Sequence, residues 1–143
     1  MDNPSISKLN NYIYLGSYEP AFNDSEDFKN LGIDVIINCA KEIVYPPTTK
    51  YVVEHFPLED NEDASMLEYM DDANKKINRY LKYGKKIYIH CVDGISRSPA
   101  ILIYYLMSSK KLTFIKAYSL LKSIRPGIKI NPKFERELKT VEE

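Results

Sequence analysis

One cysteine, Cys91, stands between a strand-like segment and a helix-like segment, and this position constrains the chain more than any other feature. Residues 86–89 are typical of a buried strand, and residues 99–106 form an almost wholly apolar run that favours a buried helix. The intervening loop therefore leads from a strand end to a helix start, where unpaired backbone N–H groups and the helix dipole favour an anion. The same surroundings favour the thiolate, which is the nucleophilic form of a cysteine.

Other residues of this loop suit the binding of an anion. Arg97 follows Cys91 after five residues, and its guanidinium can donate two parallel hydrogen bonds to a phosphate or sulfate. Gly94 supplies the backbone freedom that a loop needs to curl its N–H groups inward. A buried structural cysteine is the alternative, but it gives no reason for these neighbours. We therefore expect sulfur to attack a tetrahedral oxyanion bound by Val92, Asp93, Gly94, Ile95, Ser96 and Arg97.

The composition indicates one soluble domain. The 143 residues suffice for a hydrophobic core, and no apolar run approaches membrane-spanning length. Basic and acidic residues number 20 each, so the charge balance indicates neither nucleic acid nor an anionic membrane as a partner. Two cysteines, one of them a candidate nucleophile, indicate a reducing compartment. We expect a single domain over residues 1–143, in the cytoplasm or the nucleus, with no metal or other cofactor.

Strands and helices are predicted to alternate along the chain. The apolar patterns and turn residues predict strands at 12–15, 35–39, 51–56 and 87–90, a loop at 41–50, and helices at 25–31, 65–83, 99–109, 113–123 and 131–138. This order predicts an α/β fold with a central, largely parallel, twisted sheet of about five strands flanked by helices. Ligands of such sheets bind beyond the carboxyl ends of the strands, where His90 and Cys91 fall.

The segment from His90 to Ser98 resembles the active-site signature of the cysteine-dependent protein tyrosine phosphatases, His-Cys-x5-Arg-Ser/Thr. The run Ser96-Arg97-Ser98 looks most similar to the dual-specificity branch, and three further segments, 11–16, 56–60 and 125–134, fit it as well. The resemblance covers about residues 8 to 140. Val92-Asp93 departs from many relatives, and we expect this acidic residue beside the phosphate to influence substrate choice or pH dependence.

The resemblance implies roles for three residues in particular. Cys91 would be the nucleophile that forms a cysteinyl-phosphate, and Arg97 would clamp the phosphoryl oxygens. Asp60 matches the general acid, which protonates the leaving oxygen from a mobile loop. Spacing alone leaves three neighbouring carboxylates as alternatives, namely Glu59, Glu62 and Asp63.

Supporting roles are implied for residues around this centre. His90 would orient the loop without touching substrate, and Asn131 would support the rim of the site. Ser98 would stabilise the thiolate while the cysteinyl-phosphate is hydrolysed, although a plain helix N-cap is an alternative. Arg125 stays open between a position near the cleft and a surface position at a helix end.

Cys39 ends a predicted strand, as Cys91 does, and adjacent parallel strands would bring both thiols to one sheet edge. A nearby thiol could trap an oxidised nucleophile as a reversible disulfide, which makes Cys39 a candidate redox partner. A small buried hydrophobic residue is the alternative, and we favour it at this point.

The predicted function is a phosphatase that hydrolyses phosphotyrosine and phosphoserine/phosphothreonine in phosphorylated proteins. A non-catalytic phosphopeptide-binding module is the first alternative, but binding alone needs neither Cys91 nor Asp60. A phosphoinositide or RNA 5′-phosphate phosphatase would favour basic loop residues, which this loop lacks. A sulfur transferase would use a loop cysteine too, but the Arg97-Ser98 pair favours phosphate.

Overall fold

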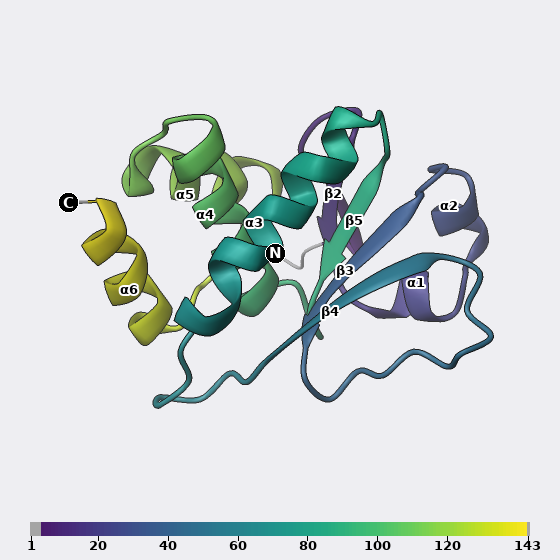
Figure 1. The fold of residues 1–143 in the computed structure, drawn as a ribbon, viewed down its shortest axis with the longest axis horizontal. Helices are drawn as coiled ribbons and strands as arrows, with labels where there is room; N and C mark the ends of the chain where they lie inside the picture. Colours follow the sequence, from purple (N-terminus) through teal and green to yellow (C-terminus); the bar gives the residue numbers. More distant parts are fainter. Residues whose placement is uncertain (1–3, 143) are drawn as a thin grey trace.

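Five strands form one sheet in the order β1-β2-β5-β3-β4 in this computed structural model, which describes residues 4–142 (Figure 1). The strands are β1 (Ile6–Lys8), β2 (Ile13–Gly16), β3 (Val35–Ala40), β4 (Val52–Leu58) and β5 (Ile87–His90). The helices are α1 (Glu19–Phe22), α2 (Glu26–Lys29), α3 (Leu67–Lys82), α4 (Arg97–Ser109), α5 (Phe114–Ile124) and α6 (Pro132–Glu142).

The sheet is largely parallel, as predicted. Strand β5 lies in the centre and pairs in parallel with β2 and β3, and β3 pairs in parallel with β4. Only β1 runs antiparallel among the strands of the described chain. Four carboxyl ends therefore meet at one edge of the sheet, and the segments that follow β3, β4 and β5 lie close together there.

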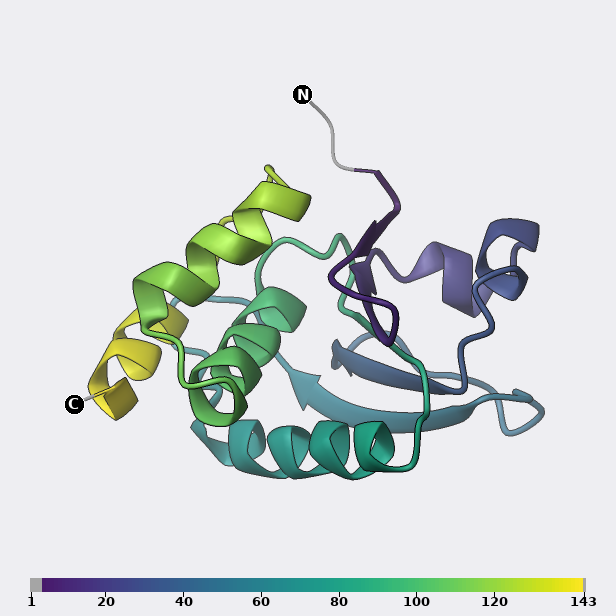
Figure 2. The same cartoon turned by 90° about the horizontal axis from the view of Figure 1, so that it is seen from above.

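Helices cover both faces of the sheet. Helices α3 to α6 pack on one face, and α1 and α2 pack on the other (Figures 1 and 2). Ile37 and Ile89 belong to the larger core under α3 to α6, whereas Ile36 and Tyr88 belong to the smaller core near α1 and α2. This alternation follows from the two-residue period of a strand, and burial on both faces explains the continuous apolar runs.

The predicted helices are confirmed, with small changes at their ends. The Ser25 hydroxyl caps α2 by accepting the N–H of Phe28 at 3.3 Å. Gly84 follows α3 with a φ of 72°, in the left-handed region that glycine adopts without strain. Helix α4 begins at Arg97, two residues before the predicted start. Its first turn therefore includes the arginine of the motif.

Two short elements escaped the sequence analysis. Strand β1 has three residues and α1 has four, too few to show a period of two or of 3.6. No helix within residues 4–142 has the length and hydrophobicity needed to cross a bilayer.

Candidate active site

Residues 91–97, the anion loop, follow the carboxyl end of β5, and five successive carbonyls of this loop accept hydrogen bonds from outside it. A trans peptide holds a C=O and the following N–H on opposite sides, so the N–H groups of residues 92–96 point away from these donors, into the loop. The acceptors and donors are Cys91 with His90 Nδ1, Val92 with the N–H of Tyr18, Asp93 and Gly94 with the side chain of Arg125, and Ile95 with the N–H of Lys129.

Gly94 has two reasons to be glycine. Its φ of 68° lies in the left-handed region. A Cβ at this position would also stand 2.6 Å from the carbonyl oxygen of Gly16. Any side chain here would push the anion loop away from β2, so Gly94 fixes the curvature of the loop.

The Cys91 thiol lies beneath the anion loop. The residue is 3% exposed, and its Sγ lies 3.2 Å from the Oγ of Ser98. The N-cap of α4 is Ser96, and Ser98 is the second residue of the helix, so the interpretation of Ser98 as a plain N-cap is wrong. The contact instead places a hydroxyl where it can donate a hydrogen bond to a thiolate.

Arg97 is buried and leaves its Nε without a hydrogen-bond partner among the described residues. The residue is 6% exposed, and its Nη1 donates to the carbonyl of Leu58 at 3.0 Å. The carboxylate of Glu42 accepts from Nη1 at 2.6 Å and from Nη2 at 2.9 Å. In the described chain, Nε of Arg97 is the one buried side-chain nitrogen or oxygen atom without a partner. A bound oxyanion would satisfy this donor.

The ion pair with Glu42 sets the charge state of both side chains. Burial by itself would lower the pKa of Arg97, but the Glu42 carboxylate and Cys91 outweigh it and raise that pKa. The hydrogen bonds from Arg97 hold the pKa of Glu42 below its ordinary value. The sequence analysis missed Glu42. The available signal was a carboxylate just after a predicted strand at the edge where Cys91 lies.

Asp60 stands at the border of the anion loop. Its Oδ1 accepts hydrogen bonds from Ser96 Oγ and from Asn131 Nδ2, both at 3.2 Å. Asn131 also donates its backbone N–H to Ser96 Oγ at 2.8 Å and its side-chain amide to the carbonyl of Asn61 at 2.7 Å. Hydrogen bonds thus join the loop before α3 to the start of α4 and to the start of α6.

A cavity of about 640 Å³, the candidate catalytic cleft, is lined by both Asp60 and Arg97. Of the alternative acids, Glu59 is paired with Lys41 at 2.6 Å, and Glu62 and Asp63 do not line the cleft. The lining consists of Lys41, Glu42, Glu59, Asp60, Val92, Asp93 and Arg97.

His90 is buried next to Cys91 and connects two parts of the site. Its Nδ1 lies 2.8 Å from the carbonyl of Cys91, which can only accept, so Nδ1 carries the proton. Its Nε2 lies 2.8 Å from the hydroxyl of Tyr45, which therefore donates to it. Burial lowers the pKa of His90 to about 4, so the ring is neutral at pH 7. Tyr45 lies in a loop without periodicity, and the sequence analysis missed it.

Arg125 holds the outer side of the anion loop. The residue is 1% exposed, so its interpretation as a surface arginine is wrong. Its Nε and Nη2 donate to the carbonyls of Gly94 and Asp93 at 2.9 and 2.8 Å. Its Nη1 donates to the carbonyl of Pro4 at 2.5 Å and to Ser7 Oγ at 3.0 Å. The side chain therefore ties the anion loop to the amino-terminal strand.

Cys39 lies beside Cys91 at the edge of the sheet. Strands β3 and β5 are paired in parallel with Asn38 opposite His90, so Cys39 and Cys91 are the next residues in register. Both are buried free thiols. Burial, with a further contribution from Cys91, raises the pKa of Cys39 well above its ordinary value.

A parallel α/β sheet whose central strand leads into a cysteine, an anion loop and an inward arginine is the arrangement of the cysteine-dependent phosphatases. The chain belongs to the family described as dual specificity phosphatase, catalytic domain, whose sequence profile matches residues 13–143.

Known relatives agree with this membership. Human protein phosphatase Slingshot homolog 2 is 34% identical over 140 residues, which cover 96% of this chain and 10% of the relative. Drosophila melanogaster Slingshot is 35% identical, with coverage of 98% and 13%. The chain thus spans about a tenth of the length of these two relatives. Variola virus dual specificity protein phosphatase H1 is 28% identical over 93% of this chain and 80% of the viral protein.

A solved structure supports the fold. Human DUSP28 superposes with a TM-score of 0.88 at 24% identity, covering 97% of this chain and 93% of the other.

Proposed function

We propose that this chain is a protein phosphatase that hydrolyses phosphotyrosine, phosphoserine and phosphothreonine through a cysteinyl-phosphate. The observation that carries the proposal is the unpartnered Nε of buried Arg97, which ends the anion loop and lies close enough to Cys91 for their charges to interact. This donor and the inward N–H groups of the loop suit a tetrahedral dianion, and the buried Cys91 thiol at the start of the same loop supports attack on the phosphorus of that dianion.

In the first step, the Cys91 thiolate attacks phosphorus and the bond to the substrate oxygen breaks. Arg97 and the amides of the anion loop stabilise the charge on the three transferred oxygens, since positioning and electrostatics dominate phosphoryl transfer. Asp60 gives its proton to the departing oxygen. Its contacts with Ser96 and Asn131 support this role, because they hold the carboxyl group at the border of the cleft.

In the second step, water attacks the cysteinyl-phosphate and the sulfur leaves as a thiolate. Asp60, now ionised, accepts a proton from the attacking water. The Ser98 hydroxyl donates a hydrogen bond to the departing sulfur, and its distance of 3.2 Å from Cys91 supports this role. His90 and Arg125 act as positioning residues, because they hold loop carbonyls and never reach the phosphate.

Three loops contribute the lining of the catalytic cleft: residues 41–51, residues 59–66 and the anion loop. These loops are short, so they offer little material for the high walls of a pocket restricted to phosphotyrosine. We therefore infer a cleft that accepts phosphotyrosine and the shorter phosphothreonine and phosphoserine.

The decisive experiment measures hydrolysis of an aryl phosphate and of matched phosphotyrosine and phosphothreonine peptides. The parent should hydrolyse all three in the presence of a metal chelator, and Cys91→Ser and Arg97→Ala should abolish turnover. Full activity of either variant would overturn the mechanism. Phosphopeptide binding without turnover by the parent would instead support a binding module, and strict use of phosphotyrosine would contradict the dual specificity.

We further infer that Cys39 is a redox partner of the nucleophile. Adjacent parallel strands lie about 4.8 Å apart, and disulfides bridge Cα atoms at such separations. The register that sets Cys39 beside Cys91 supports this assignment over that of a merely hydrophobic residue. Peroxide would oxidise the Cys91 thiolate to a sulfenic acid with release of hydroxide. The Cys39 thiol would then attack that sulfur, forming a disulfide and releasing water.

A further inference from the structure

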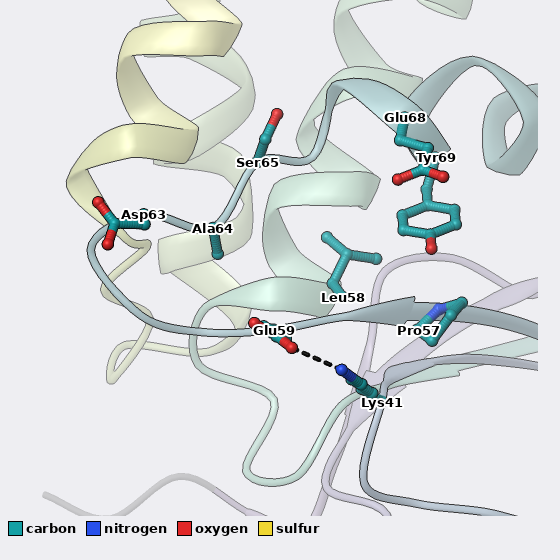
Figure 3. Close-up of a pocket in the computed structure, with 9 residues that line it drawn as sticks. All are labelled: Lys41, Pro57, Leu58, Glu59, Asp63, Ala64, Ser65, Glu68 and Tyr69. Carbon is teal, nitrogen blue, oxygen red and sulfur yellow. Dashed lines mark hydrogen bonds and ion pairs between the residues drawn. The ribbon is translucent and has the colours of Figure 1, made fainter.

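A second cavity adjoins the catalytic cleft. It has a volume of about 360 Å³ (Figure 3) and shares two lining residues with the cleft, Lys41 and Glu59. The ion pair between them is 2.6 Å long, and both side chains are more than half exposed. Such a pair contributes little to stability, so an incoming charged group can replace one partner at small cost.

The second cavity combines an apolar lining with carboxylates. Its apolar lining comes from Pro57 and Leu58 in β4 and from Ala64 and Tyr69 nearby. Asp63, Glu68 and Ser65 complete the lining, and among the described residues neither Asp63 nor Glu68 forms an ion pair. An arginine or lysine side chain matches this arrangement, because its apolar stem packs on hydrophobic surface while its cationic end seeks anions.

The two cavities together are strongly acidic for a site that receives a phosphate. Their linings contain six carboxylates but only two cations, Lys41 and Arg97, and both cations are already paired with carboxylates. Lys129 follows α5, and Lys133 is in α6; neither lines either of these two cavities, although Nζ of Lys133 donates to the backbone carbonyl of Asp63 at 3.0 Å. The six are Glu42, Glu59, Asp60, Asp63, Glu68 and Asp93.

We propose that the candidate active site selects phosphopeptides that carry a basic residue beside a single phosphorylated residue, and that the second cavity binds this basic side chain. The inference rests on the proposed function and specifies its substrate class. One phosphate is satisfied by Arg97 and the loop amides, and any further negative charge meets the carboxylates. Doubly phosphorylated peptides, inositol polyphosphates and RNA 5′-triphosphates are therefore disfavoured substrates.

The experiment uses three phosphothreonine peptides that differ only in the residues flanking the phosphothreonine, which are arginine, alanine or glutamate. We expect kcat/KM to be about three- to tenfold higher for the arginine peptide than for the alanine peptide, and lower still for the glutamate peptide, as suits one or two exposed ion pairs. The preference should weaken as salt rises, because exposed charges are screened.

The double variant Asp63→Asn/Glu68→Gln tests the cavity itself. It should bring the arginine-to-alanine ratio close to one while leaving hydrolysis of an aryl phosphate, which has no flanking residues, unchanged. The variant Glu26→Gln/Asp27→Asn is the matched control, since it removes two carboxylates from α2 on the other face of the sheet. It should keep the preference.

The outcomes separate this inference from the proposed function. Hydrolysis of the aryl phosphate without a preference for arginine, or with a preference that the Asp63/Glu68 variant retains, would overturn the inference alone. If the parent hydrolyses no phosphate ester, the proposed function fails. Dissociation constants of the same peptides for Cys91→Ser then test the charge preference as binding, and equal affinities would overturn it.

Discussion

The carboxylate of Glu42 makes two hydrogen bonds to the guanidinium of Arg97, at 2.6 and 2.9 Å, and these bonds use the terminal nitrogens while Nε stays unpartnered. An arginine has several rotatable bonds, and holding it in one orientation costs conformational entropy. The hydrogen bonds to Glu42 compensate for this loss of entropy before any substrate binds. The guanidinium is thus oriented in advance, with its Nε left free to bind an oxyanion.

Removal of Glu42 should therefore weaken catalysis although Glu42 never touches the phosphate. We expect Glu42→Ala to lower kcat/KM for an aryl phosphate about 10- to 100-fold, in line with the loss of charge-assisted hydrogen bonds. Glu42→Gln, which keeps one acceptor, should recover part of the loss. Steady-state kinetics of the two variants test this, with Glu62→Ala as the control outside both cavities. Equal rates for Glu42→Ala and the parent would refute the positioning role.

Replacement of Asp60 should matter most for poor leaving groups. An aliphatic alkoxide leaves less readily than a phenolate, so it depends more on a proton from Asp60. We expect Asp60→Asn to reduce turnover of a phosphothreonine peptide about 10²- to 10³-fold, and that of an activated aryl phosphate less than tenfold. A uniform loss for all leaving groups would indicate a structural effect instead.

Acidification should destabilise the fold through His90. Its pKa is lowered by burial to about 4 in the folded chain, against an ordinary value of 6.5. Below pH 6.5 the unfolded chain binds a proton at His90 that the folded chain does not bind. The contribution of His90 to the free energy of unfolding is therefore complete above pH 6.5 and is lost as the pH falls toward 4. The free energy of unfolding should fall by about 3 kcal/mol over this range.

Urea unfolding at several pH values between 7 and 4.5 measures this dependence. The variant His90→Gln should be less stable at pH 7, because the hydrogen bonds to the Cys91 carbonyl and Tyr45 change. It should also show a flatter dependence on pH in this window. If the slope is the same in parent and variant, other groups are responsible.

Oxidation should be reversible only while Cys39 is present. After peroxide treatment, we expect a thiol reductant to restore most activity of the parent, with a transient intermediate lighter by two hydrogens and a peptide linking Cys39 to Cys91. Cys39→Ser and Cys39→Ala should lose activity permanently, because the sulfenic acid then proceeds to sulfinic acid. The two variants together separate the effect of the thiol from that of packing. If both variants recover as much activity as the parent, the assignment is disproved.

The sequence was most informative where one local signal carries the structure. Turn residues and caps at Ser25 and Gly84 locate helix ends, and continuous apolar runs locate β3 and β5. The cysteine motif located the anion loop for the same reason. Its parts lie within nine consecutive residues.

Partners that lie far apart in the sequence could not be predicted. Glu42 and Tyr45 belong to a loop without periodicity, and only the packing of β3 beside β5 brings them to Arg97 and His90. The burial of Arg125 could not be predicted either, because a helix-end arginine usually faces solvent. Its burial depends on strand β1, which is too short to show a strand pattern in the sequence.

The bond from Arg125 to the carbonyl of Pro4 joins residues 121 positions apart, and the same side chain holds the anion loop. The curvature of that loop therefore depends on the folding of almost the entire chain. A partly folded molecule would still contain Cys91, but as an ordinary thiol without an oriented arginine or inward amides. Hydrolysis of a phosphate ester should thus begin only once the segments that contain Pro4 and Arg125 have met. Completion of folding is in this way coupled to the onset of reactivity.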